Sequence, residues 1–475
     1  MSRLVPMILP TTWPSGWRCH LLLTLSVAAM AGCAHYQARP IVPEQLFDRL
    51  DGRTLLDAGL ADAVEPAHLA ATWPPDTWDL PALTAAALYF HADLALARAS
   101  WAVARAGRMS AGERPNVGLI AGPGFNASTP PTTITPWILN LEFDFTVETA
   151  GKRSFRINEA TALADSARYR IADAAWGARA RVRQAFLDLF SATEAAGLLD
   201  RQEQVLGTSL VLFQRQLDAG EISAFQMSQA RLQLATLRVS IADSRRQQQD
   251  ARARLATAIG LPVSALEDTQ FNFALFRRAP VDIADAAARR QAALNRADVL
   301  GALSDYNASQ SALQLEIARQ YPDLRLGPGY QMDQNSHKWS LLFPLSLPVF
   351  SRNQGRIAEA DARRSLAAVR VEAVQARTLG AIDRALVAYR AALARIGLAD
   401  QLLLDAQRVA DVARSQFSAG AISQLDLSVV ELDVMTRALV RLEAGVQAQQ
   451  ALGDIEDAMQ RPADLPLNPL PGEPQ

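Results

Sequence analysis

The sequence has little cysteine and almost no net charge. Only Cys19 and Cys33 occur in 475 residues, and 47 basic side chains nearly balance 49 acidic ones. Two thiols are too few for a framework of disulfides. The stability of the protein must therefore come from packing and assembly. The balanced charge gives no field that would attract nucleic acid, and we expect no nucleic-acid partner.

Side chains that carry catalysis or bind metals are also sparse. The five histidines are scattered, with no two at the spacing of ligands on a helix: His20, His35, His68, His91 and His337. The eight methionines are spread along the chain, which gives no support for a soft-metal relay. We therefore expect no catalytic, cofactor-binding or metal site, and we do not expect an enzyme.

Proline is absent from two long stretches. The chain holds 25 prolines, but none lies in 137–261 or in 349–461. Because proline interrupts helices, both stretches are predicted to be mainly helical. Residues 33–80 are rich in proline and are interpreted as an extended N-terminal arm. The proline-rich tail, 463–475, is predicted to be disordered.

The first 32 residues have the features of a secretory signal peptide. Arg3 and Arg18 precede the apolar run 21-LLLTLSVAAMAG-32, which is too short for a permanent membrane span. The small residues directly before Cys33 resemble a bacterial lipoprotein processing site. Cys33 is therefore predicted to be the lipid-bearing first residue of the mature chain; the alternative is a plain signal peptide with an incidental cysteine.

An internal repeat extends over most of the chain. The pairs 156-RI-157 and 159-EA-160 recur as 356-RI-357 and 359-EA-360, an offset of 200 residues that also relates Gly220 to Gly420. The offset becomes 202 at the pair Trp137 and Trp339, and 205 at the two Gly-Pro-Gly turns, 122–124 and 327–329. Insertions therefore fall between elements, where loops tolerate them. We interpret the chain as two copies of one unit, 81–262 and 263–462.

Each unit is predicted to have the order helix, strand, loop, strand, long helical hairpin. Apolar residues alternate in 137-WILNLEFDF-145 and in 339-WSLLFPLSLPV-349, although Pro344 and Pro348 weaken the latter. The segments 117–125 and 324–332 are the predicted partner strands. The helix that contains Arg156 to Asp218 would be roughly 95 Å long, more than a globular domain needs.

The fold class is therefore mainly α with a small β part. Four strands of this length could cross a membrane but cannot close a barrel, because known spanning barrels have at least eight strands. The chain must supply a fraction of a shared barrel: two chains would give eight strands and three would give twelve. Trp137 and Trp339 fit either a membrane-interface girdle or packing at the barrel rim.

These features resemble the TolC-type outer-membrane efflux factors over essentially the whole mature chain. The segments 148-ETAGKRSFRINEA-160 and 348-PVFSRNQGRIAEA-360 are similar to strand-to-helix junctions of the heavy-metal (cobalt/zinc/cadmium resistance) subgroup of RND tripartite efflux systems. The resemblance implies a homotrimer in the outer membrane, with a twelve-stranded transmembrane β-barrel continued by an α-helical barrel of long hairpins in the periplasm. The implied partners are outer-membrane lipid, a periplasmic adaptor (membrane fusion) protein and an inner-membrane RND pump.

The function implied by this resemblance is that of a passive exit duct for heavy-metal cations. One alternative is a duct for drugs or other small organic compounds. Another is a lipid-anchored periplasmic coiled-coil adaptor, which would explain Cys33 and the helices but neither the strand pairs nor the duplication.

The candidate functional residues lie at the turns of the two hairpins. Glycine suits the left-handed cap that ends one helix, and serine can accept from the first amides of the next. The resemblance implies that the adaptor docks at these tips; helix capping alone is the alternative. The tip residues are Gly220, Glu221, Ile222 and Ser223, and Gly420, Ala421, Ile422 and Ser423. Glu221 and Ala421 are candidates for distinguishing two adaptor sites.

The resemblance also implies that Asp426 lines the narrow end of the tunnel. Threefold symmetry would make a ring of three carboxylates, whose repulsion would raise their pKa values. The first repeat has Gln226 at this place, so only one ring is expected. The alternative is an ordinary solvated helix residue.

Overall fold

A computed structural model describes residues 35–64, 74–128, 135–278, 286–346 and 348–462. The chain divides into two units, 1–52 and 53–475. The described part of the first unit contains one helix, α2 (Pro43–Asp51), which begins with proline at its first turn and has no buried side chain. The following paragraphs mainly describe the second unit.

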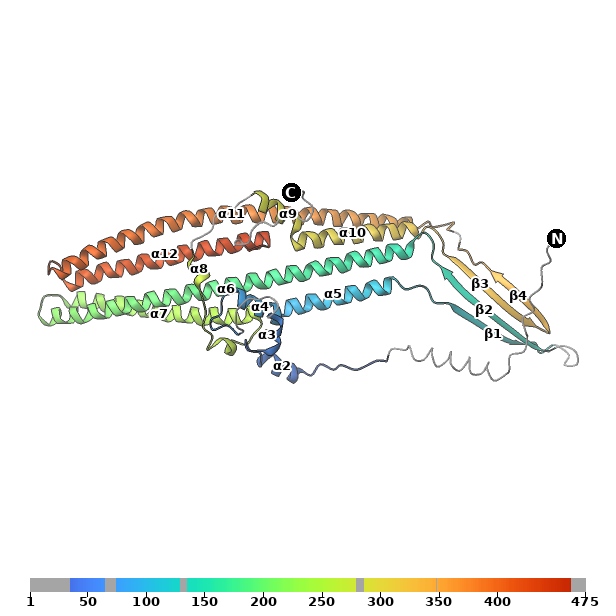
Figure 1. Cartoon of the computed structure of the whole chain (residues 1–475), viewed down its shortest axis with the longest axis horizontal. Helices are drawn as coiled ribbons and strands as arrows, with labels where there is room; N and C mark the ends of the chain where they lie inside the picture. The colour runs from blue at the N-terminus through green and yellow to red at the C-terminus, as the bar shows by residue number, and fades with distance from the viewer. Residues whose placement is uncertain (1–34, 65–73, 129–134, 279–285, 347, 463–475) are drawn as a thin grey trace, which may run out of the picture. The chain divides into compact units, whose positions relative to one another are not determined.

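The second unit repeats one succession of elements (Figure 1). The first repeat is formed by α3 (Ala58–Val64), α4 (Leu80–Phe90), α5 (Ala92–Ala111), β1 (Gly118–Phe125), β2 (Trp137–Val147), α6 (Lys152–Asp218) and α7 (Ala224–Ile259). The second is formed by η2 (Val263–Leu266), α8 (Ala274–Arg277), α9 (Ala286–Asn295), α10 (Ala297–Ala318), β3 (Leu324–Asp333), β4 (Ser336–Leu342), α11 (Gln354–Ser418) and α12 (Gln424–Met459). The predicted long hairpins are thus α6–α7 and α11–α12.

The interpretation of 33–80 as an extended arm is wrong in part. The helices α2 and α3 lie within this range, and α4 begins at its end. The prolines separate short apolar pieces, and Leu60 and Trp78 from these pieces are buried. Trp78 also forms a parallel β-bridge with Phe271. Burial of these side chains therefore orders a segment that its proline content alone predicts to be irregular.

The four strands form one antiparallel sheet in the order β1-β2-β3-β4. The two repeats meet at the β2–β3 pair, in which Leu141 lies opposite Tyr330. The predicted strand 339–349 is wrong at both ends, because β4 begins at Ser336 and ends at Leu342. It begins early because the left-handed residues Gln334 and Asn335 make a tight turn after β3. It ends early because Pro344 has no N–H to donate to a neighbouring strand.

Four helices run side by side from the sheet, in the order α5, α6, α10, α11 (Figure 1). The helices α6 and α11 continue to the far ends of the two hairpins, where α7 packs on α6 and α12 packs on α11. Among the described residues, no single helix is both long and apolar enough to cross a membrane; α4 and α5 meet the criteria only as a pair bent by 48°.

The largest core lies where α4, α6 and α7 meet residues 261–276. Its centre is aromatic: the ring of Phe186 is 4.9 Å from that of Phe273 and 5.4 Å from that of Phe276. A smaller core joins α9, α11 and α12 around Ile382 and Ile455. The cores therefore fix the middle of each hairpin, and a hydrogen bond from Gln202 to Thr436 joins α6 to α12 nearer the tips.

A buried charge cluster joins α6 to α12, and so joins the two repeats. The Glu456 carboxylate accepts hydrogen bonds from both terminal nitrogens of Arg179, at 3.0 Å each, and lies 3.3 Å from Nε of Arg183. The side chains of Arg183 and Glu456 are only 5% and 8% exposed. Burial lowers the pKa of Arg183, and the charge of Glu456 opposes this effect. The two arginines therefore share the carboxylate of Glu456, and the nearby charges of Asp454 and Asp457 add to their compensation.

We predict that Glu456→Ala destabilises the protein by about 3–5 kcal/mol, because it removes the carboxylate that pairs directly with the buried guanidinium of Arg183. Asp243→Ala is the matched control: it removes an exposed ion pair with Arg246 and should cost less than about 1 kcal/mol. Denaturant unfolding followed by helical circular dichroism measures both. Equal midpoints for the two variants would show that the cluster does not stabilise the fold.

Candidate functional site at the hairpin tips

The two hairpin tips have the same backbone structure. Gly220 has φ 75° and Gly420 has φ 74°, the left-handed conformation expected from the sequence. At the first tip the amide of Glu221 donates to the carbonyl of Gln216 at 2.8 Å, and that of Gly220 donates to Leu217 at 3.0 Å. The second tip repeats both bonds. These are the two bonds of the Schellman motif, which satisfies the last carbonyls of a helix.

Glycine is needed here for its conformation rather than for space. A Cβ added at Gly220 or Gly420 would meet nothing within 4 Å. The constraint is the positive φ, which side chains of L-residues rarely adopt. A substitution at either place therefore strains the turn locally but creates no clash within the chain.

Each tip also begins its second helix with a capping box. Ser223 Oγ accepts from the amide of Gln226 at 3.3 Å, and the amide of Ser223 donates to Gln226 Oε1 at 2.9 Å. Ser423 and Asp426 make the same pair of bonds at 3.2 and 3.0 Å. The predicted role of the serines as acceptors is confirmed. The reciprocal bonds to the serine amides were not predicted, although serine followed three residues later by an acceptor side chain is the signature of this motif.

The capping box sets the electrostatics of Asp426. Its carboxylate is exposed, and the hydrogen bonds from the hydroxyl and the amide of Ser423 lower its pKa below the ordinary value. This direction is opposite to the rise expected for a ring of three carboxylates. Within one chain Asp426 is a stabilised anion, and a raised pKa would require the carboxylates of other copies nearby.

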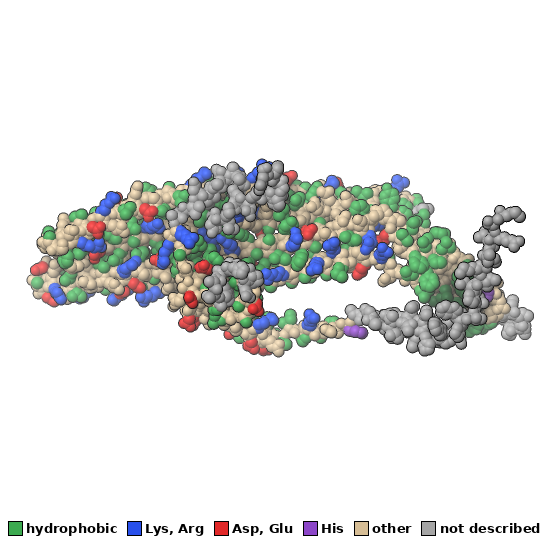
Figure 2. All heavy atoms as spheres, in the orientation of Figure 1, with side chains coloured by type: hydrophobic (Ala, Val, Ile, Leu, Met, Phe, Trp, Pro, Cys, Tyr) green, Lys and Arg blue, Asp and Glu red, His purple; other side chains and the backbone are tan. Residues whose placement is uncertain are grey.

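Exposed apolar side chains surround the polar tips. Ile222 and Ile422 are half-buried, whereas Phe225 and Val429 beside them are exposed. A hollow of about 430 Å³ beside the second tip is lined by α11 and α12 residues: Arg408, Val409, Val412, Ala413, Gln416, Ile422, Asp426 and Val430. Figure 2 shows such hydrophobic side chains among charged ones along the hairpins. Both tips thus present a capped backbone turn with apolar side chains behind it.

The structure brings the tip residues of each hairpin together, but it does not cover every predicted site. Cys33 lies outside the described residues. Asp426 belongs only to the second tip, as the sequence predicts, and Gln226 takes its place in the first. Among the described residues, no three His, Cys, Asp or Glu side chains gather into a group that could hold a metal ion.

Two strand pairs in one sheet and two long hairpins with exposed tips define the class of outer-membrane channel subunits. The chain matches the model of the family "Outer membrane efflux protein" over residues 82–261 and 288–459. It belongs to this family, and the two matched segments correspond to the two repeats. The predicted family, the outer-membrane location and the non-enzymatic character are thereby confirmed.

Individual relatives agree with this assignment. The chain is 26% identical over 222 residues to the cobalt-zinc-cadmium resistance protein CzcC of Cupriavidus metallidurans. That match covers 46% of this chain and 52% of CzcC, so the chain spans about half the length of this relative.

Solved structures share the fold at low sequence identity. The outer membrane protein VceC of Vibrio cholerae superposes with a TM-score of 0.66 at 19% identity, over 81% of this chain and 97% of VceC. CusC superposes with a TM-score of 0.66 at 17% identity, over 90% of this chain and 99% of CusC.

We predict that acid loosens the second tip but not the first. The lowered pKa of Asp426 means that its ionised form stabilises the cap above the ordinary carboxyl value and that this contribution is lost as pH falls through the folded-state pKa. Gln226 does not titrate. Hydrogen exchange by mass spectrometry, corrected for intrinsic rates, should therefore show falling protection at 420–428 below about pH 4, with 220–228 as the internal control. Parallel changes at both tips would contradict this assignment.

Proposed function

We propose that this protein is the exit duct of a tripartite RND efflux pump and passively conducts heavy-metal cations from the periplasm to the exterior. The observation that carries the proposal is the duplicated unit of strand pair and long tipped hairpin in a member of the outer membrane efflux family. The metal cargo is supported by the similarity to CzcC, a cobalt-zinc-cadmium resistance protein, over about half its length.

The duct is proposed to be a homotrimer. Within the described residues β1 and β4 each pair on one side only, so both edges of the sheet remain open. Open edges are not tolerated in a lipid environment, and four strands are too few to close. Three copies bring twelve strands and six long hairpins, which form the membrane and periplasmic parts of one continuous passage.

The tips are proposed to dock a periplasmic adaptor that connects the duct to the inner-membrane pump. Their exposed position at the ends of the hairpins, away from the sheet, supports this role (Figure 1). Glu221 and Ala421 differ at the same place of otherwise equal turns and would distinguish two adaptor sites. Photo-crosslinkers at these two positions test the contact, and a failure of both to capture the co-expressed adaptor would reject it.

Cys33 is proposed to carry a lipid that anchors the mature N-terminus in the outer membrane. The anchor adds to the membrane affinity of the strands and does not replace it. Incorporation of labelled palmitate into the wild-type chain but not into Cys33→Ser tests this step, and equal labelling of both rejects it.

We predict that Asp426→Asn weakens block of the reconstituted channel by divalent cations from the periplasmic side and raises its conductance. Asparagine keeps a side-chain oxygen that can accept from Ser423, so the capping box persists while the charge of the proposed ring is removed. Single-channel recording in planar bilayers measures both quantities. Gln226→Ala is the control at the equivalent place of the first hairpin.

If Asp426→Asn matches wild type in conductance and block, Asp426 is only a cap residue and the aperture lies elsewhere. If the wild-type protein forms no channel at all, the duct itself is rejected.

The cargo is tested separately. A strain that lacks this gene should become sensitive to cobalt, zinc or cadmium and recover when the gene is restored. Sensitivity to organic compounds without metal sensitivity would instead favour the alternative duct for drugs. The other alternative, a coiled-coil adaptor, is not retained because the chain belongs to the outer membrane efflux family.

A further inference from the structure

All acidic residues, lysines and arginines of the four strands lie on one face of the sheet. In an antiparallel pair, residues opposite each other share a face, as do alternate residues along one strand. Glu142 lies opposite Gly329, and Lys338 lies opposite Gln331, two residues further along β3. The same alternation adds the remaining charged residues of the strands to what we call the charged face: Asp144, Arg325 and Asp333.

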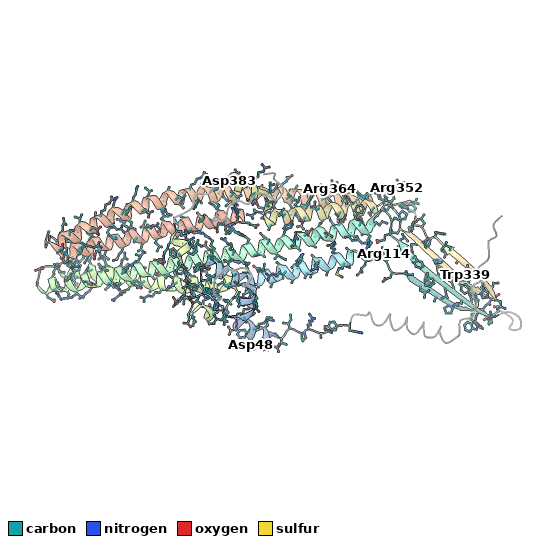
Figure 3. The ribbon with its side chains drawn as sticks, in the orientation of Figure 1. Asp48, Arg114, Trp339, Arg352, Arg364 and Asp383 are labelled. Carbon is teal, nitrogen blue, oxygen red and sulfur yellow. The ribbon has the colours of Figure 1, made fainter. Side chains whose placement is uncertain are left out.

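The opposite face is apolar or aromatic apart from His337. Its side chains on β2 are Trp137, Leu139, Leu141, Phe143, Phe145 and Val147. Phe143 is 45% exposed and Trp339 is 82% exposed, whereas Gly327 and Gly329 on the charged face are buried. Figure 2 shows hydrophobic side chains gathered over the strands, and Figure 3 shows Trp339 on the sheet, away from the long helices. Because the lipid-facing side of membrane strands is apolar, the charged face is the one that would line the proposed passage.

The charged face has one carboxylate more than it has cations. Arg325 pairs with Asp144, with 3.2 Å between its Nε and Asp144 Oδ1, and Lys338 Nζ donates to Asp333 Oδ2 at 2.9 Å. The half-buried Glu142 forms no hydrogen bond or ion pair with any described residue. Its charge acts on Arg325, but this guanidinium is already paired with Asp144. Glu142 is therefore the uncompensated negative charge of the sheet.

A glycine makes room for this carboxylate. A Cβ on Gly327 would lie 2.8 Å from Glu142 Oε1, so a larger residue there would displace the carboxylate. The side chain of Glu142 thus lies across the strand β3 at a position that has no side chain of its own. At the offset of 202 that relates Trp137 to Trp339, the place of Glu142 in the second repeat is occupied by Pro344. Each chain therefore has one carboxylate of this kind.

The nearest charged residues outside the strands lie at the helical end of the sheet. Glu148 and Asp323 each form an ion pair with a residue near the start of α6. Arg114 and Arg352 lie near the ends of α5 and α11 beside the sheet (Figure 3). The connections that follow β1, β3 and β4 contain no Asp, Glu, Lys or Arg: 126–136, 334–335 and 343–351. On the strands, all of which the structure describes, Glu142 is thus the one acid or base without a partner.

We propose that Glu142 gives the membrane part of the duct a preference for cations over anions. The inference rests on the proposed homotrimer, which holds three copies of this carboxylate at one level of the passage. Uncompensated carboxylates in a water-filled pore attract cations and repel anions, because walls of low dielectric constant focus their field. Among the described residues no group of metal ligands surrounds Glu142, so it attracts hydrated cations without binding a particular metal.

Single cysteines test which face meets water. Glu142→Cys in the membrane-embedded protein should react with a charged maleimide that cannot cross membranes, because the thiol would line the passage. Leu141→Cys, the neighbouring residue on the apolar face, should react far less, because its thiol would face lipid. The parent chain, which retains Cys33, sets the background. Labelling of Leu141→Cys equal to or above that of Glu142→Cys would overturn the assignment of the charged face to the passage.

Reversal potentials of the reconstituted channel in a gradient of KCl test the preference itself. Glu142→Gln should lower the ratio of cation to anion permeability severalfold, and Glu142→Lys should make the channel favour anions. The matched control is Asp144→Asn with Arg325→Gln, which removes two charges that compensate each other and should stay near wild type. The differences should shrink in about 1 M salt, where the Debye length is about 3 Å, whereas a change in the shape of the pore would persist.

The outcomes separate this inference from the proposed function. Glu142→Asp, which keeps the charge, should retain the wild-type preference and shows that the site tolerates substitution. An unchanged permeability ratio in Glu142→Gln, or an equal loss of preference in the double variant, would overturn the role of Glu142. If Asp426→Asn alters conductance and block while Glu142→Gln alters nothing, the duct stands and only this inference is wrong. If the wild-type protein forms no channel, both are rejected.

Discussion

The open edges of the sheet are the constraint on which the other features depend. A strand whose N–H and C=O groups face no partner is a site of association in water and is excluded from hydrocarbon. Here both end strands of the sheet are open on one side within the described residues, and they belong to different repeats. A closed ring of three copies would therefore join the second repeat of one copy to the first repeat of the next.

The chain contains two copies of one structural unit. The same strand pair and hairpin occur twice in the chain, and equivalent places carry different residues although the backbone is alike. Lys152 forms an ion pair with Asp323, whereas Arg352, at the place of Lys152 in the second repeat, forms no ion pair with a described residue.

Much of the fold was predictable because its signals are local. Proline-free stretches, alternating apolar residues in 137–145 and left-handed glycines at 220 and 420 each act over a few residues, and the helices, three of the strands and both turns appear as predicted. The exceptions depend on longer-range partners. The helix α3 is ordered by burial against other elements, and β4 starts with a turn that the sequence analysis did not identify. No sequence feature near Lys152 indicates that its partner is Asp323, which lies 171 residues away.

The candidate site was predictable in part for the same reason. The glycine and the serine of each tip have conformational roles that the residue types indicate at these positions. Asp426 was considered only for its charge, and its hydrogen bonds to Ser423 were missed although the spacing contains them. Whether the carboxylates of Asp426 from several copies lie close together depends on how the copies assemble. The residues near Asp426 in the sequence carry no information about that.

The two tips have the same backbone structure, and this determines how many equivalent sites each chain offers to a protein that binds there. At both turns the helix-terminal amides and carbonyls are occupied by the same internal hydrogen bonds, so the main chain offers one and the same outline twice in every subunit. A protein that recognises only this backbone structure finds two equivalent sites on each chain. Twice as many copies of it can therefore bind as there are chains. A protein that contacts the side chain after the glycine encounters Glu221 at one turn and Ala421 at the other. Its copies then occupy two kinds of site that are not equivalent.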